Sequence, residues 1–264
     1  MKFNANNKNI SGLCIFAIAM GFLESAVVIY LRELYYPGGF QFPLQIIPKN
    51  IAMVELCREL ATIIMLIGIA YLSGKSKLTR FGYFLIVFAI WDLFYYIFLF
   101  LFLGWPQSLF TWDILFLIPV PWTGPVLAPC LVSLGMIVFG SFILHFHNSS
   151  QTTRPYRHGR ITISSSQWFL LISGSVIIII SFMYDYFEVI KSQNNSASFF
   201  PSPKGLLHEL QFYIPQKFNW YLFLTGYTLS SLGAILFIKN NLSIITKKKP
   251  FNHLTIKPFN HSTI

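Results

Sequence analysis

One stretch of this sequence places two acids and a base at helical spacing inside an apolar run. Glu55, Arg58 and Glu59 follow an i, i+3, i+4 pattern, and Thr62 continues it at i+7, so all four share one helix face. Carboxylates on such a face can bind a cation or pass on a proton, and a neighbouring guanidinium can neutralise them. We expect Arg58 to pair with one or both of its flanking carboxylates.

Two other apolar segments carry acids in a similar setting. Asp92 shares a helix face with Tyr95 and Tyr96, and Asp185 shares one with Glu188. Tyrosine rings beside a carboxylate can contact a bound cation through their faces. These two segments therefore favour the same chemistry as the first.

A fourth apolar segment combines an acid with small residues. Glu24 shares a broad helix face with Ala17 and Gly21, and small side chains let a neighbouring helix approach closely. Arg32 lies at the edge of this face, where we expect it to pair with Glu24 or Glu33.

These four polar faces lie at similar depth, so the simplest packing turns them into one pocket. The acids outnumber the arginines, so the sequence offers no expected partner for Asp92 or for the pair Asp185 and Glu188. This favours a cation, an amine or a proton-linked site. The alternative is a set of ion pairs and tyrosine–carboxylate hydrogen bonds that only fix helix packing. The candidate ligand-binding residues are Glu24, Arg32, Glu55, Arg58, Glu59, Asp92, Tyr95, Tyr96, Asp113, Trp122 and Asp185.

The segments that must position these residues are membrane helices. Charged residues make up 11% of the 264-residue chain, well below the roughly 25% of soluble domains. Apolar runs of about 20 residues recur, each long enough to cross a bilayer, and a backbone in lipid must pair its own polar groups. The fold class is therefore an all-α integral membrane protein with a six-transmembrane-helix bundle. We expect spans at 12–35, 51–73, 81–103, 122–146, 167–190 and 218–238.

The basic residues predict how this bundle is oriented. Most of the 19 lysines and arginines fall in the N-terminus, the loops 73–80 and 147–166, and the tail, whereas the nine acids fall on the opposite side. The positive-inside rule then places both termini in the cytoplasm and the acidic pocket toward the outside. Residues 1–240 form the single transmembrane domain. Residues 241–264 form a low-complexity tail that contains a nearly repeated octamer.

A segment rich in proline and tryptophan precedes the fourth span. Residues 105–129 contain five prolines and three tryptophans, including Trp122, together with Asp113. Prolines at this density prevent a continuous helix. We expect residues 105–121 to form either a re-entrant element, as where transporters bind substrate, or an interfacial cap anchored by tryptophans.

Several other chemistries lack the residues they need. The basic residues that give the net charge of +10 lie in short loops, so we expect no nucleic-acid partner. Cys14, Cys57 and Cys130 are widely spaced in apolar segments, and the expected spans carry no histidine–carboxylate motif, so we expect no metal site. Neither a GxSxG elbow nor a P-loop occurs. The residues leave the identity of any cofactor open.

Four stretches carry a resemblance to a known group of sequences. GFLESAVVIYLRELYYP, VELCREL, WDLFYY and PVPWTGPVLAP, within residues 12–135, resemble a group of bacterial multi-span membrane proteins without an assigned activity. The resemblance implies a six-span fold in the bacterial inner membrane, and it implies no function.

Three functions remain open at this point. The first is transport or binding of a small cationic or amine-bearing molecule in the outward-facing acidic and aromatic pocket. The second is an intramembrane enzyme that acts on a lipid or isoprenoid with two carboxylates as acid and base. The third is an assembly or scaffold subunit whose polar faces meet a partner protein or a second copy of the chain. The lipid bilayer surrounds the protein in all three.

Overall fold

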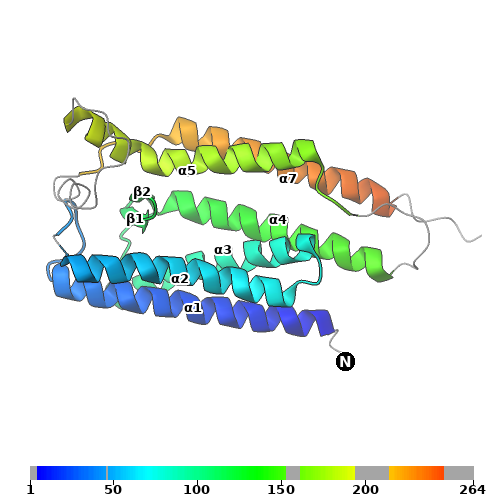
Figure 1. Cartoon of the computed structure of the whole chain (residues 1–264), viewed down its shortest axis with the longest axis horizontal. Helices are drawn as coiled ribbons and strands as arrows, with labels where there is room; N and C mark the ends of the chain where they lie inside the picture. The colour runs from blue at the N-terminus through cyan, green and yellow to red at the C-terminus, as the bar shows by residue number, and fades with distance from the viewer. Residues whose placement is uncertain (1–4, 46, 153–160, 194–213, 247–264) are drawn as a thin grey trace, which may run out of the picture.

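Six long helices of the described chain lie side by side along one axis (Figure 1). The computed structural model describes residues 5–45, 47–152, 161–193 and 214–246. The expected tail therefore lies outside the described residues from residue 247 on. The helices are α1 (Ala5–Tyr35), α2 (Lys49–Ser73), α3 (Lys77–Leu103), α4 (Leu127–Thr152), α5 (Ser165–Gln193) and α7 (Trp220–Thr246).

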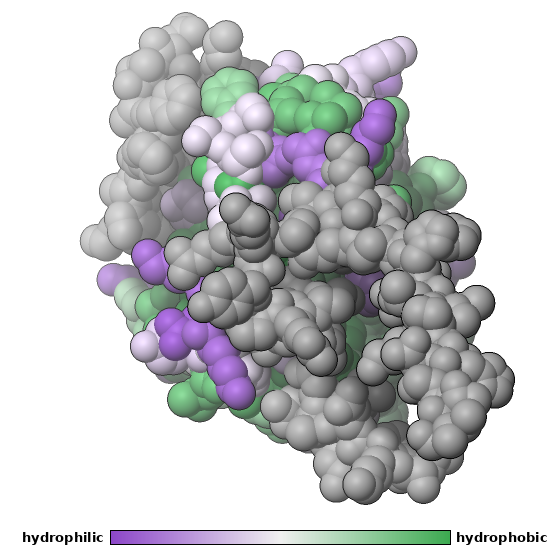
Figure 2. All heavy atoms as spheres, turned by 90° about the vertical axis from the view of Figure 1, so that its right-hand side faces the viewer, coloured by the Kyte–Doolittle hydropathy of each residue, from purple (hydrophilic) through white to green (hydrophobic). Residues whose placement is uncertain are grey.

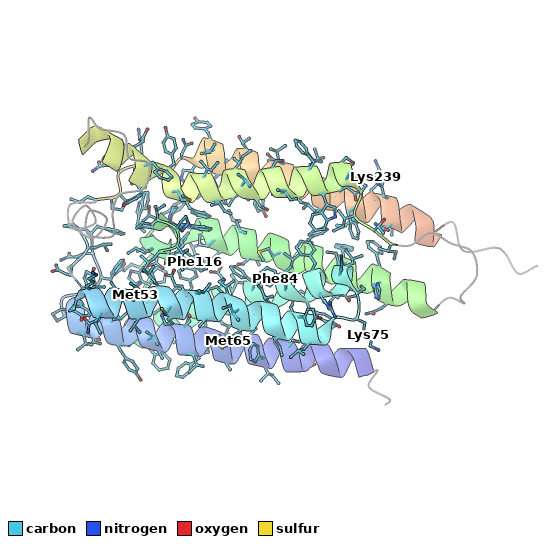
Figure 3. All side chains as sticks on the ribbon, viewed as in Figure 1. Met53, Met65, Lys75, Phe84, Phe116 and Lys239 are labelled. Carbon is cyan, nitrogen blue, oxygen red and sulfur yellow. The ribbon has the colours of Figure 1, made fainter. Side chains whose placement is uncertain are left out.

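Successive helices run in opposite directions along this axis (Figure 1). The α2–α3 turn around Lys75 and the residue Lys239 lie toward the same end, where the described N-terminus also lies (Figure 3). Viewed from that end, the part of the surface that is not grey shows hydrophilic residues in several places beside hydrophobic ones (Figure 2). Large apolar side chains such as Leu72 and Phe169, which are 81% and 72% exposed, point outward and suit a lipid surround.

Five of these helices are long and apolar enough to cross a membrane. They are Ile10–Tyr35, Lys77–Leu103, Leu127–Asn148, Ser165–Glu188 and Trp220–Leu242, which match five of the six predicted spans within a few residues. The remaining predicted span, 51–73, is the helix α2, which is 25 residues long and carries Glu55, Arg58 and Glu59 in its first half. The mainly helical fold is confirmed, and the sixth span stays a prediction.

The helices approach closely where glycines face a neighbour. A Cβ at Gly21 would lie 2.9 Å from the Trp91 carbonyl oxygen on α3, and Ala17 on the same face is fully buried. On the other side of α3, a Cβ at Gly140 of α4 would lie 2.8 Å from the Gly82 carbonyl oxygen. The small residues of α1 therefore do allow the close approach that we expected from the sequence.

The proline-rich segment folds into a β-hairpin toward the end of the bundle away from the α2–α3 turn (Figure 1). Strand β1 (Trp112–Phe116) pairs antiparallel with β2 (Trp122–Pro125), and Asp113 lies opposite Gly124. The paired strands satisfy backbone groups that a proline-broken helix could not. The helix of the fourth predicted span consequently begins at Leu127 and not at residue 122, because residues 122–125 belong to β2.

Candidate functional site

A cavity of about 390 Å³ opens at the hairpin end of the bundle, and we call it the charged cavity. Its walls are the last turns of α1, described residues of the segment 36–48, the first turns of α2, Tyr95 of α3, the strand β1 and Leu117. Most of the lining is apolar. Of the predicted site residues, the charged cavity brings together Arg32, Glu55, Arg58, Glu59, Tyr95 and Asp113.

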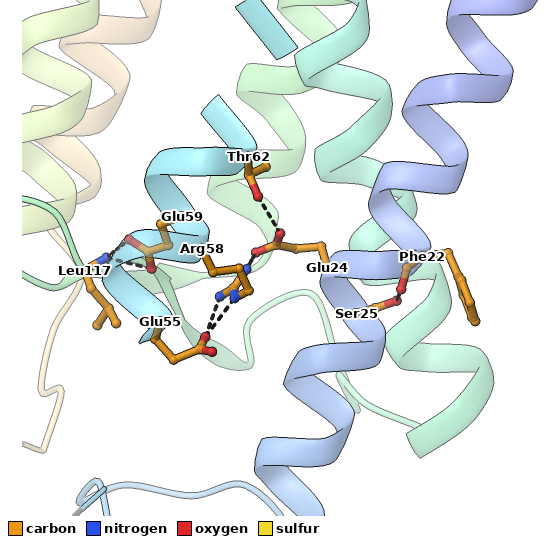
Figure 4. Close-up of polar contacts among 8 residues, drawn as sticks. All are labelled: Phe22, Glu24, Ser25, Glu55, Arg58, Glu59, Thr62 and Leu117. Atoms are coloured by element: carbon orange, nitrogen blue, oxygen red, sulfur yellow. Dashed lines mark hydrogen bonds and ion pairs between the residues drawn. The ribbon is translucent and has the colours of Figure 1, made fainter. Parts of the chain in front are cut away.

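Arg58 is the centre of an ion-pair network between α1 and α2 (Figure 4). Its guanidinium contacts a carboxylate oxygen of Glu24 and lies 2.7 Å from the carboxylate of Glu55. The hydroxyl of Thr62 donates to the second oxygen of Glu24 at 3.1 Å. The expected pairing of Arg58 with Glu55 is confirmed, and Glu24 is the second partner in place of Glu59.

Arg32 pairs with an acid that sequence spacing did not indicate. Its Nη2 atom lies 3.1 Å from the Asp113 carboxylate in β1, and both side chains are buried. The guanidinium also stacks on aromatic rings, 3.8 Å from the Trp105 centroid and 4.4 Å from the Phe40 centroid. The prediction that Arg32 pairs with Glu24 or Glu33 was wrong, because the hairpin brings a remote acid to the end of α1.

Glu59 is the acid of the lining that forms no ion pair with a described cationic side chain. Both of its carboxylate oxygens accept from the backbone N–H of Leu117, at 2.9 and 3.1 Å (Figure 4). The residue is 7% exposed. No cationic side chain among the described residues lies within ion-pair distance of it, whereas Glu55 and Asp113 are both paired. The contact also ties the chain after β1 to α2.

The segment 36–48 adds lining residues that sequence reasoning missed. The hydroxyl of Tyr36 accepts from the backbone N–H of Gln45 at 2.8 Å, and both residues line the cavity. Burial raises the pKa of Tyr36, so its phenol is protonated. Burial also raises the pKa of Asp113, and the nearby Arg32 guanidinium opposes that shift. The aromatic residues near Arg32 could have indicated part of this lining from the sequence, since cationic side chains stack on such rings.

The remaining predicted residues lie elsewhere. Asp92 and Trp122 line a second cavity of about 250 Å³, and Tyr96 is packed in an aromatic cluster with Trp105. Asp185 is buried on α5 and lines neither cavity. The single pocket that we predicted from four helix faces was therefore wrong, because residues of the hairpin form a wall of each of two cavities.

Within the described ranges, no group of three or more metal-binding side chains comes together. No protein-family model, curated protein or solved structure matches this chain.

Proposed function

We propose that this protein binds and transports a small molecule that carries an amine, and that the charged cavity is its binding site. The observation that carries the proposal is that the carboxylate of Glu59 lies in a mainly apolar cavity and forms no ion pair with a described cationic side chain. An ammonium group beside Glu59 would supply the missing positive charge, and the carboxylate would accept its hydrogen bonds.

The other charges in the cavity narrow the ligand class. Arg32 and Arg58 are already paired with acids. Lys49 also lines the cavity, is exposed, and forms no ion pair with any described acid. A ligand with an ammonium group at the buried Glu59 and an anionic group toward the exposed Lys49 matches both unpaired charges, so we propose a zwitterion with an apolar body.

The size of the cavity limits that apolar body. A cavity of about 150 Å³ accommodates benzene, so about 390 Å³ has room for roughly 15 non-hydrogen atoms. A single-ring amino acid or a comparable amine lies within this size.

Transport requires the cavity to face one side of a membrane. Six spans with both termini in the cytoplasm would open the charged cavity to the outside, and the basic residues at the opposite end of the bundle favour this orientation. The resemblance to bacterial inner-membrane proteins supports the same location.

The first test is ligand binding by the full chain in mild detergent. We would measure melting temperature with phenethylamine, phenylalanine and 2-phenylethanol, and compare wild type with Glu59→Gln. We expect the two amines to raise the melting temperature of wild type and the neutral alcohol to have little effect. Glu33→Gln is the matched control, because Glu33 is exposed on α1 and does not line the cavity.

The outcomes separate the competing functions. Equal stabilisation of Glu59→Gln and wild type by phenethylamine would contradict the proposal. Native mass spectrometry of the same samples would reveal a retained lipid or a second protein chain, which would favour the enzyme or the scaffold function instead. Transport is then tested by measuring the uptake of labelled phenylalanine into proteoliposomes that contain a variant shown to bind normally.

A further inference from the structure

The second cavity is separate from the charged cavity and has a different chemistry. It lies between α3, α4, α5 and the hairpin, with a volume of about 250 Å³. Its lining holds one acid and no basic residue. This contrasts with the charged cavity, where Arg32, Arg58 and Lys49 accompany the acids.

Aromatic rings from three parts of the chain make up much of the lining. They are Phe84 and Phe88 of α3, Phe116 and Trp122 of the hairpin, and Phe182 of α5, and Figure 3 labels Phe84 and Phe116 inside the bundle. The rings support one another. Trp122 stacks on Phe182 at 6.4 Å between centroids, and Phe116 meets Trp122 edge to face at 5.4 Å. We call this set of five rings and its cavity the aromatic cage.

The acid of the cage is Asp92, which lies inside a membrane-crossing helix. Its Oδ2 atom accepts from the Ser133 hydroxyl of α4 at 2.7 Å. None of the described lysines or arginines forms an ion pair with it. A carboxylate at this depth is costly unless a cation or further hydrogen bonds stabilise its charge.

We propose that the aromatic cage binds an alkylated ammonium group, with Asp92 as its counter-ion. Ring faces attract such cations, and a carboxylate among rings adds a full opposite charge. The side chains of the lining that can accept a hydrogen bond are Asp92, Ser133 and Ser175, and the rest of the lining is mainly aromatic or aliphatic. A quaternary ammonium needs no acceptor. This site does not rest on the proposed function of the charged cavity.

The cavity size sets the probe. Scaled from a cavity of about 150 Å³ that holds benzene, about 250 Å³ accommodates roughly ten non-hydrogen atoms. Choline fits within this limit. Its neutral counterpart, 3,3-dimethylbutan-1-ol, has the same shape without the charge, so the pair separates charge recognition from apolar filling.

The experiment measures binding of radiolabelled choline to the full chain in maltoside detergent, with 3,3-dimethylbutan-1-ol as competitor. We expect saturable choline binding to wild type, weakened about tenfold or more by Asp92→Asn and by Phe182→Leu. Phe169→Leu is the control for losing a ring on α5, because Phe169 is 72% exposed and outside the cage. Glu59→Gln should bind choline as wild type does.

Three results would overturn the aromatic cage as an ammonium site. One is the absence of saturable choline binding to wild type, and another is equal competition by the neutral alcohol. The third is choline binding that survives Asp92→Asn but is lost in Glu59→Gln, which would assign the cation to the charged cavity. If Asp92→Asn does not elute as a single species, and so is not properly folded, the Phe182→Leu variant and the competition experiment still test whether the aromatic cage binds the ammonium group.

Discussion

The guanidinium of Arg32 lies 3.1 Å from the carboxylate of Asp113, although the two residues are 81 positions apart in the chain. This buried pair joins the end of α1 to the first strand of the hairpin, and both residues line the charged cavity. The position of the hairpin therefore affects the shape of the proposed binding site through this ion pair.

Breaking this pair on one side should destabilise the protein. Arg32→Gln or Asp113→Asn leaves a buried charge without its partner, which costs about 3–5 kcal/mol. We expect the double variant to lose less than the sum of the single losses, because both charges are then removed. Unfolding in a detergent titration, followed by circular dichroism, measures this. Strictly additive losses would show that the two charges do not interact.

Arg58 should matter more for stability than either acid that it contacts. Arg58→Gln leaves Glu24 and Glu55 unpaired together, whereas Glu24→Gln keeps the contact between Arg58 and Glu55. Since Arg58 is partly exposed, we expect a loss of about 3 kcal/mol, at the low end for buried pairs. Adding Glu24→Gln and Glu55→Gln to Arg58→Gln should recover part of it. The same unfolding titration measures the free energy of unfolding of each variant and so checks their order of stability.

The contact between α1 and α3 should tolerate no added side chain at Gly21. Gly21→Val places methyl groups against the Trp91 carbonyl and Phe94, and overpacking of this kind costs about 1–3 kcal/mol. Gly12→Val on the same helix is the matched control, because apart from the nearby backbone of α1 itself no described atom lies within 4 Å of a Cβ there. A lower melting temperature for Gly21→Val alone is expected. Equal effects of the two substitutions would mean that α1 and α3 do not meet at Gly21.

The sixth span can be tested across α2 alone. Gly38 precedes this helix and Lys75 follows it, so a spanning α2 puts the two positions on opposite sides of the membrane. In a chain with Cys14, Cys57 and Cys130 replaced by alanine, Gly38→Cys should react with an impermeant thiol reagent from outside intact cells. Lys75→Cys should react only after the cells are opened. Labelling of both positions from the same side would contradict a spanning α2.

The helices and their polar faces could be predicted well from the sequence. Apolar length determines where a membrane helix can form. All six predicted spans coincide with described helices, and five of these are long and apolar enough to cross a membrane. Helical spacing also placed Arg58 beside Glu55 correctly, because residues three apart always share a face.

The hairpin could not be predicted with the same certainty. The prolines indicated that residues 105–121 form no continuous helix, yet nothing local shows that Trp112 will pair with Pro125. The pairing depends on the helices around it, since an isolated two-stranded hairpin is at best marginally stable.

The sequence by itself determined the apolar helices, the acids within them and the residues that share each polar face. These features follow from composition and local periodicity. Only the tertiary structure decided that Arg32 pairs with Asp113, that Glu59 is left without a cationic partner, and that Asp92 belongs to a separate aromatic cavity. The physical reason is that a side chain's partner depends on which helices and strands pack together, and that choice is made over long separations in the chain.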